Sequence, residues 1–265
     1  MSVRYVEYAA SPRFAWLVEC FWMLEGPGTG VPDAILPDGR MELVFHAGAR
    51  FTRHARGAID RQPAAIVAGQ LTEPVVLSHH GYARVAAIRL RPGTAHALLP
   101  VGDFTGQIVD LDAVFPSAGE LRERLFDARD DRQRIDCLER WLEHVVRKTP
   151  QPDIDAVVGE ILRTDGRARI AHVAARLGLG PRHLQRRFAD TVGLSPKQFA
   201  RIVRLQAALR RVRTGSTLAP LADVALACGY YDQPHMARDF RQLAAMSPDV
   251  WREHAGTLAP LFVGG

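Results

Sequence analysis

Short apolar segments separated by turn residues dominate the first 110 residues. Five such segments are Val18 to Leu24, Met41 to Phe45, Ala64 to Val67, Val75 to His79 and Val85 to Leu90. Glycine and proline stand between them at 26–28, 37–39, 69 and 81, which indicates turns. Regular short strands with such turns are typical of a β-barrel or a β-sandwich. This part of the chain is therefore predicted to be β-rich.

From Ser117 onward the hydrophobic residues recur every three or four positions, which predicts amphipathic helices. Two helices are expected, joined near Ala128 to Asp131. Their apolar positions are Leu121, Leu125, Ile135, Leu138, Trp141, Leu142 and Val145. This stripe can either cap the β-rich part or present an apolar edge to a second copy of the chain.

A domain boundary is predicted at residues 147–152 (RKTPQP), which contain two prolines and no apolar residue. Proline lacks an N–H donor and restricts the residue before it, so one helix should end here and another should begin after Pro152. Beyond this point every apolar pattern is helical. The expected fold class is α+β: a β-barrel domain with flanking helices over residues 1–150, then an all-α domain over residues 151–265.

An internal repeat is the most informative feature of the second half. Residues 183–188 (HLQRRF) recur 52 positions later as residues 235–240 (HMARDF). The same offset relates the Ser-Pro pair at 195–196 to the Ser-Pro pair at 247–248. Matching segments at a fixed distance indicate two copies of one structural unit.

An alanine and a glycine four residues apart precede each copy: Ala174 with Gly178, and Ala225 with Gly229. A small alanine lets a second helix cross closely, and a glycine accepts the positive φ of a sharp turn. Each unit is therefore predicted to be a helix-turn-helix.

The second helix of the first unit should bury Leu184 and Phe188, which lie one turn apart. Its opposite face then carries Arg182, Gln185, Arg186 and Arg187. Arginine reads guanine and glutamine reads adenine in the major groove. Arg182, Gln185 and Arg186 fall in the first two turns and are the predicted base-reading residues.

The second unit repeats this pattern with Met236 and Phe240 buried. Its free face is expected to carry Gln233, His235, Arg238 and Arg241. Gln233 and His235 are the candidates for reading bases, whereas Arg238 is assigned to a phosphate contact.

The charge distribution also favours an anionic partner for the second half. Of the net charge of +5, residues 1–150 contribute −1, from 18 basic and 19 acidic groups. Residues 151–265 contribute +6, from 16 basic and 10 acidic groups. A basic domain beside a neutral one indicates nucleic acid before other partners.

The two repeat units resemble the double helix-turn-helix DNA-binding domain of the AraC/XylS family of bacterial transcription regulators. The matching stretches lie within residues 169–254 and include 170–179, 182–188, 229–241 and 247–252. The resemblance implies helix-turn-helix units at about 169–192 and 219–244, joined by a linker helix at about 197–212. Pro234 departs from the family, which often has serine there, but proline suits a first helical turn.

The first half resembles the cupin-like domain attached to some of these regulators, at residues 36–46 (LPDGRMELVFH) and 67–72 (VAGQLT). The resemblance implies a sequence-specific transcription regulator that is not an enzyme and needs no cofactor. Its implied partners are double-stranded operator DNA, RNA polymerase, a small-molecule effector and a second copy of the chain. No apolar run is long enough to cross a membrane, and a cytoplasmic location is expected.

The candidate effector-binding residues are Asp38, Arg40, Glu42 and His46. The first three alternate along the chain and would project to one side of a strand, where they could bind a polar effector. The alternative is that they form a solvated outer face.

A metal site is not expected. Adjacent residues on a strand point to opposite faces, so His79 and His80 cannot both line one interior beside His46. The three cysteines are scattered singly, which excludes a four-cysteine zinc site: Cys20, Cys137 and Cys228.

Two alternatives for the function remain at this stage. The DNA-binding domain could be fused to a catalytic or metal-dependent sensing barrel. The chain could also be a nucleoid-type binder without sequence preference, although faces rich in arginine and glutamine argue against it.

Overall fold

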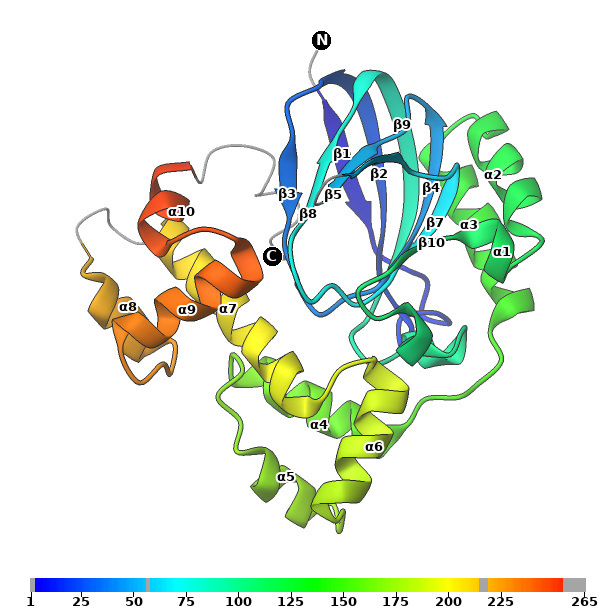
Figure 1. Ribbon diagram of the computed structural model, residues 1–265. Coiled ribbons are helices and arrows are strands. Elements are labelled where there is room, and N and C mark those ends of the chain that lie inside the picture. Colours follow the sequence, from blue (N-terminus) through cyan, green and yellow to red (C-terminus); the bar gives the residue numbers. More distant parts are fainter. Residues whose placement is uncertain (1–2, 56–57, 215–218, 255–265) are drawn as a thin grey trace.

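A computed structural model describes residues 3–55, 58–214 and 219–254 of the chain. Figure 1 shows a β-rich part with a helix pair on one side, followed by a group of helices that runs along the other side and below. The α+β fold class predicted from the sequence is confirmed.

The larger sheet has six antiparallel strands in the order β1-β2-β9-β4-β7-β10. Their bounds are β1 Arg4–Tyr8, β2 Val18–Thr29, β4 Glu42–Gly48, β7 Ala65–Ala68, β9 His80–Leu90 and β10 Ile108–Asp110. Both faces of this sheet are apolar. One carries Phe21, Phe45 and Ile88, and the other carries Trp22 and Val44.

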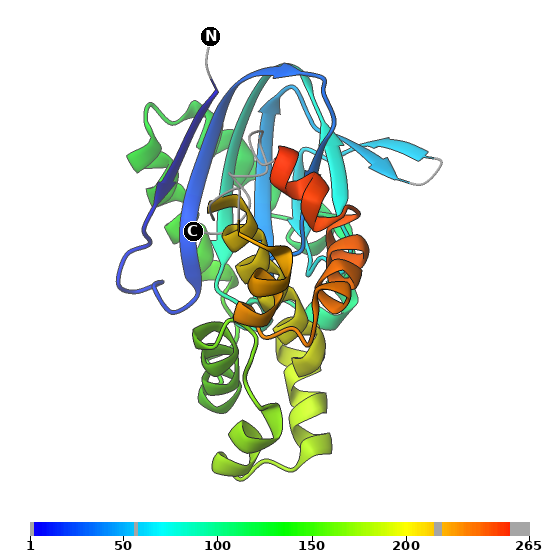
Figure 2. The ribbon, with the colours of Figure 1, turned by 90° about the vertical axis from the view of Figure 1, so that its left-hand side faces the viewer.

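The smaller sheet has four antiparallel strands in the order β3-β8-β5-β6. Their bounds are β3 Asp33–Ile35, β5 Thr52–Ala55, β6 Ala58–Arg61 and β8 Val75–Ser78. In the described residues no strand of one sheet pairs with a strand of the other, so the domain is two sheets rather than a closed barrel. The β5–β6 hairpin projects away from the body of the molecule (Figure 2).

The expected turn at residues 26–28 is wrong, because strand β2 continues through it to Thr29. Gly26, Pro27 and Gly28 pair in register with Ala83, Tyr82 and Gly81 of β9. Gly28 is required by packing: an added Cβ would lie 2.2 Å from the backbone oxygen of His79. Glycine in a strand often marks such a close backbone approach, and here it does not mark a turn.

Helices α2 (Ala118–Asp127) and α3 (Asp131–Val145) cover the face of the larger sheet that points away from the smaller one (Figure 1). The Trp141 ring packs edge-on against Phe45, with centroids 6.4 Å apart. The apolar stripe of the pair thus lies in the core of the β-rich part, as the capping alternative expected. A short helix, α1 (Leu111–Val114), and two 3₁₀ turns, η1 (Ala95–Ala97) and η2 (Val101–Phe104), complete this part.

Seven helices form the rest of the described chain. They are α4 Pro152–Arg163, α5 Ile170–Arg176, α6 Pro181–Val192, α7 Pro196–Thr214, α8 Leu221–Ala227, α9 Gln233–Ala244 and α10 Pro248–His254. The pairs α5–α6 and α8–α9 occupy the segments expected for the helix-turn-helix units, and α7 runs between them (Figure 1). Gly178 and Gly229 have φ of +66° and +77°, the left-handed turns that the sequence predicted.

The two halves share a hydrophobic core. Leu36, which follows β3, is buried among the C-terminal helices. Gln206 on α7 donates from Nε2 to the backbone oxygen of Pro37 at 2.7 Å. Thr105 donates from Oγ1 to the backbone oxygen of Gly193 at 2.7 Å. The segment between β3 and β4 and the residues after η2 therefore dock the β-rich part on α6 and α7.

Candidate DNA-binding and ligand-binding sites

Helix α6 presents an arginine- and glutamine-bearing face to solvent. Pro181 occupies the first turn, where its missing N–H costs nothing. Leu184 and Phe188 are buried and hold the helix to its core. The predicted base-reading residues are exposed: Arg182, Gln185 and Arg186.

Arg187 does not belong to this face, contrary to the sequence-based expectation. Its guanidinium is half-buried and forms a two-pronged ion pair with Asp153 of α4, one prong being 2.9 Å long. It also donates to Gln151 Oε1 at 2.9 Å. The side chain points toward the N-terminus of α4 because the carboxylate of Asp153 lies in the first turn of that helix. Arg187 therefore anchors α6.

Helix α9 is built in the same way. Asp232 caps its N-terminus by accepting from the backbone N–H of His235 at 2.7 Å. Gln233, Arg238 and Arg241 are exposed, as expected. His235 differs, because its ring is half-buried edge-on against Tyr230, with centroids 5.3 Å apart. Contact with the buried Tyr230 ring therefore positions the imidazole, which stays partly exposed.

Asp239 occupies the repeat position equivalent to Arg187. It also anchors its helix through an ion pair, but as the acidic partner. It is buried and accepts from Arg201 Nε of α7 at 2.6 Å. Each exposed helix is therefore fixed by one ion pair at the same position of the repeat.

Tyr231 is a candidate contact that the sequence patterns did not single out. It is 86% exposed, in the turn that leads into α9, whereas its neighbour Tyr230 is buried. The sequence feature that could have indicated this exposed ring is the pair of consecutive tyrosines after Gly229, of which one is buried and the other is exposed. An exposed ring with a hydroxyl beside the reading face can contact a DNA backbone.

A second site lies inside the β-rich part. A cavity of about 440 Å³ separates the two sheets. The larger sheet contributes Trp22, Leu24, Val44, Ile66 and Val85, and the smaller contributes Ile35, Val75 and Leu77. Ligand pockets of this size and apolar character are typical sites for small molecules.

His46 is the most unusual polar residue of the cavity wall. It is 3% exposed, and neither ring nitrogen has a hydrogen-bond partner. Burial lowers its pKa to about 4, with smaller contributions from the charge of Arg50 and from His79. The imidazole is therefore uncharged at neutral pH and offers one donor and one acceptor.

Glu42, which also lines the cavity, is already satisfied. It accepts from Arg89 Nε at 2.7 Å and from Trp22 Nε1 at 3.2 Å. Burial raises the pKa of Glu42, and the neighbouring Arg89 guanidinium opposes that rise. The carboxylate is held by the protein itself.

Asp38 and Arg40 do not lie on the strand with Glu42, and this part of the expectation is wrong. They precede β4 in a turn centred on Gly39, where φ is +81°. Arg40 donates to Glu19 from Nε at 2.7 Å and from Nη2 at 2.8 Å. Asp38 accepts from the backbone N–H of Arg40 at 2.9 Å. Of the four candidate effector residues, the structure brings Glu42 and His46 to the cavity.

Within the part of the chain that the structure describes, the nucleophilic and metal-binding groups form no further centre. In the residues that the structure describes, no three His, Cys, Asp or Glu side chains gather closely enough to hold a metal ion. Cys20 is buried, and burial raises the pKa of its thiol to about 12. Such a thiol is inert at neutral pH.

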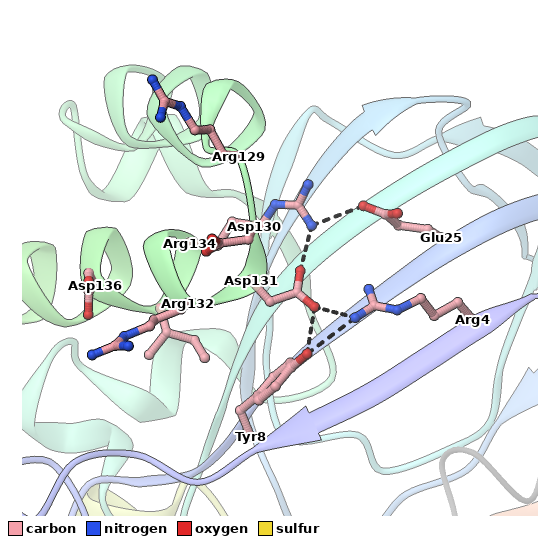
Figure 3. A pocket seen from close by; sticks show the side chains of 10 residues that line it. Arg4, Tyr8, Glu25, Arg129, Asp130, Asp131, Arg132, Arg134 and Asp136 are labelled. Atoms are coloured by element: carbon pink, nitrogen blue, oxygen red, sulfur yellow. Dashed lines mark hydrogen bonds and ion pairs between the residues drawn. The ribbon is translucent and has the colours of Figure 1, made fainter.

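A surface depression beside the N-terminus of α3 is lined by charged groups, several of which pair with one another (Figure 3). Asp131 accepts from Arg4 Nη2 at 2.5 Å, from the Tyr8 hydroxyl at 2.6 Å and from Arg134 Nη1 at 2.6 Å. Arg134 also donates to Glu25 at 3.0 Å. This network ties β1 and β2 to α3.

Comparison with known families separates the two halves. Residues 173–254 match a family described as a helix-turn-helix domain, and residues 6–110 match a domain of unknown function (DUF6597). An HTH-type transcriptional regulator of Mycobacterium tuberculosis (Rv1931c) is 32% identical over 120 residues, which are 43% of this chain and 46% of the relative. An AraC-like transcription regulator of Streptomyces antibioticus is 31% identical over 85 residues, 32% of this chain and 27% of the relative. The match thus spans less than half of either relative.

An AraC family transcriptional regulator from Rhodopseudomonas palustris aligns over 40% of this chain and 98% of its own, with 29% identity and a TM-score of 0.37. ToxT from Vibrio cholerae aligns over 88% of this chain and 98% of its own, with 10% identity and a TM-score of 0.49.

No helix in the described residues has both the length and the apolar character that crossing a membrane requires. The helix pairs α5–α6 and α8–α9 agree with the match to a helix-turn-helix domain and with the similarity to two transcription regulators. The chain is therefore similar to AraC-like transcription regulators over part of its length, with a helix-turn-helix domain at residues 173–254.

Proposed function

We propose that this chain is a sequence-specific DNA-binding transcription regulator, in which residues 151–265 bind the operator and residues 1–150 carry the controlling site. The observation that supports it best is the pair of anchored helices, α6 and α9. Each turns arginine and glutamine side chains outward from its first turns while one ion pair at an equivalent position holds it in place. Rigid presentation of such side chains suits base reading in a major groove.

The length of α7 supports the binding of two successive groove segments by one chain. Its 19 residues span about 28 Å at 1.5 Å per residue. Successive major-groove faces on one side of a duplex lie about 34 Å apart. We assign Arg182, Gln185 and Arg186 to one segment, and Gln233 and His235 to the next. Arg238 contacts a phosphate.

The controlling site is the cavity between the two sheets, and its occupant is a small molecule. Binding there can reach the DNA-binding half because β3, one wall of the cavity, leads directly into Leu36, which is buried among the C-terminal helices, and into Pro37, which accepts from Gln206 of α7. The similarity to AraC-like regulators supports RNA polymerase and a second copy of the chain as further partners, and the cytoplasm as the location.

The test begins with selection of bound sequences from a random DNA pool, followed by affinity measurements on the selected operator. Gln185→Ala and Arg186→Ala should each weaken operator binding by roughly 1–3 kcal/mol and relax the preference at one or two base pairs. Gln107→Ala and Arg124→Ala, exposed residues of the other half, serve as matched controls. Unchanged affinity and base preference in both reading-face variants would refute the proposal.

A further inference from the structure

The cavity between the sheets indicates the chemistry of its ligand. We propose that it binds a predominantly apolar small molecule with one uncharged hydroxyl or carbonyl group, which hydrogen-bonds to His46. This inference rests on the proposed controlling site and specifies the class of its occupant.

The cavity walls are apolar on both sides. Trp22, Val44 and Val85 of the larger sheet face Val75 and Leu77 of the smaller one. The mouth opens beside Val31, which lines the cavity and is 67% exposed. An apolar molecule gains by leaving water for such a site.

Three residues that line the cavity carry buried polar atoms without a protein partner: one oxygen of Asp33, Nδ1 of His79 and both ring nitrogens of His46, which makes His46 the least satisfied of them. Both ring nitrogens of His46 are buried and unbonded, although buried polar groups are nearly always paired. The His46 ring rests against Phe51, with centroids 5.6 Å apart, which fixes its orientation. A ligand hydroxyl can accept from one nitrogen or donate to the other, and a carbonyl can accept.

The charges around the cavity disfavour an ionised ligand. The residues that line it include no lysine and no arginine, so an anion finds no cationic wall, although the charge of Arg50 acts on His46. Asp33 lines the cavity and would repel an anion, and the carboxylate of Glu42 is already paired with Arg89. A cation would have to be desolvated beside a histidine whose own cationic form is already disfavoured by burial. An uncharged head group avoids both penalties.

The experiment uses the full-length protein and the neutral fluorescent probe N-phenyl-1-naphthylamine, which brightens in apolar sites. At pH 8 the probe is displaced with 1-decanol, decanoate or decylammonium, three molecules with the same chain and different head groups. We expect 1-decanol to displace the probe at a concentration at least tenfold lower than either ion does. Equal or stronger displacement by decanoate would overturn the uncharged-ligand inference.

Variants then test the site and the anchor separately. Val44→Phe, which reduces the cavity, should abolish probe binding, and unimpaired binding would refute the location. His46→Leu should keep probe binding but weaken 1-decanol about tenfold, whereas His46→Gln, which still donates and accepts, should weaken it less. If His46→Leu leaves the affinity for 1-decanol unchanged, the role of His46 is wrong. Thermal unfolding of each variant confirms that it folds.

Operator binding is measured on the same samples, so that failure of this inference can be distinguished from failure of the proposed function. If the protein binds the operator but 1-decanol does not displace the fluorescent probe, only the proposed ligand class is refuted. Binding of 1-decanol that leaves operator affinity and occupancy unchanged refutes control through this cavity and leaves the ligand class supported.

Discussion

Single residues in this protein have roles that their type alone does not indicate. The uncharged ring of His46 is buried without a partner, and Arg187, which was expected on the free face of its helix, anchors that helix instead. In both cases the surroundings decide, by burial for the histidine and by a nearby carboxylate for the arginine.

At the residue scale, the stability of the protein should depend on pH through His46. The pKa of His46 is about 4 in the folded chain and about 6.5 in the unfolded chain. Between these values the unfolded state alone binds the proton, so the free energy of unfolding falls as the pH is lowered from 6.5 toward 4. At pH 5 the loss should be about 2 kcal/mol relative to pH 7.5.

Urea unfolding of the wild type and of His46→Leu at both pH values measures this loss. On acidification from pH 7.5 to pH 5, His46→Leu should lose about 2 kcal/mol less stability than the wild type. The control His80→Leu, at an exposed histidine, should lose as much stability as the wild type. Parallel losses in the wild type and in His46→Leu would contradict the prediction.

At the scale of elements, the molecule repeats one design with different partners. Helices α6 and α9 bury equivalent residues, turn at equivalent glycines and are held at equivalent positions. Helix α6 is anchored to α4 by Arg187, and α9 is anchored to α7 by Asp239. The orientation of each reading helix is thus set by a different neighbouring element.

Two arginines on consecutive positions of α6 should therefore respond in opposite ways. Arg187→Ala should lower the free energy of unfolding by about 1 kcal/mol, because it removes a half-buried ion pair with Asp153. Arg186→Ala should change stability by less than about 0.5 kcal/mol, as exposed substitutions do, and should instead weaken operator binding. Urea unfolding and operator titrations on both variants check this contrast. A large stability loss in Arg186→Ala with none in Arg187→Ala would reverse the assignment.

At the scale of the whole molecule, the two halves act as one packed body. Phe199 of α7 is fully buried and lies close against Gly39, where an added Cβ would be 2.7 Å from the Phe199 ring. Gly93 and Gly193 occupy similar close contacts between the two halves. The DNA-binding half is therefore packed against the segment that leads out of the cavity.

Leu36→Ala should destabilise the chain by about 2–5 kcal/mol, because it empties a site in the shared core. If Leu36 transmits the state of the cavity, the variant should still bind operator but respond less to 1-decanol. Thermal unfolding and operator titrations with and without the alcohol measure both effects. An unchanged response to the alcohol would exclude Leu36 as a link.

The fragment 151–265 should bind the operator with the same base preference as the full chain. Its reading helices keep their own anchors, Asp153 and Arg201, inside the fragment. It should be less stable than the full chain, because Phe199 loses its cover, and it should not respond to 1-decanol. Operator binding by the fragment 1–150 would contradict this division of the chain.

Local sequence patterns were sufficient to predict the helical half and its exposed faces. The repeat, the glycine turns and the period of Leu184 and Phe188 are local features, and a helix forms from contacts three or four residues apart. The positions of α5 to α9 and the exposure of Arg182, Gln185 and Arg186 could therefore be predicted.

The cavity and its chemistry could not be predicted in this way, because they arise from contacts between distant segments. Strand β2 pairs with β9, bringing Val18 beside Leu90, and no local pattern specifies such a pairing. The division into two sheets, the isolation of His46 and the pairing of Arg40 with Glu19 likewise depend on contacts between segments that lie far apart in the chain. The pairing of Arg187 with Asp153 was equally hidden, because residues 34 positions apart meet only when α4 packs on α6. Contacts between distant segments are set by the packing of whole elements, whereas a sequence pattern records only the preferences of neighbours.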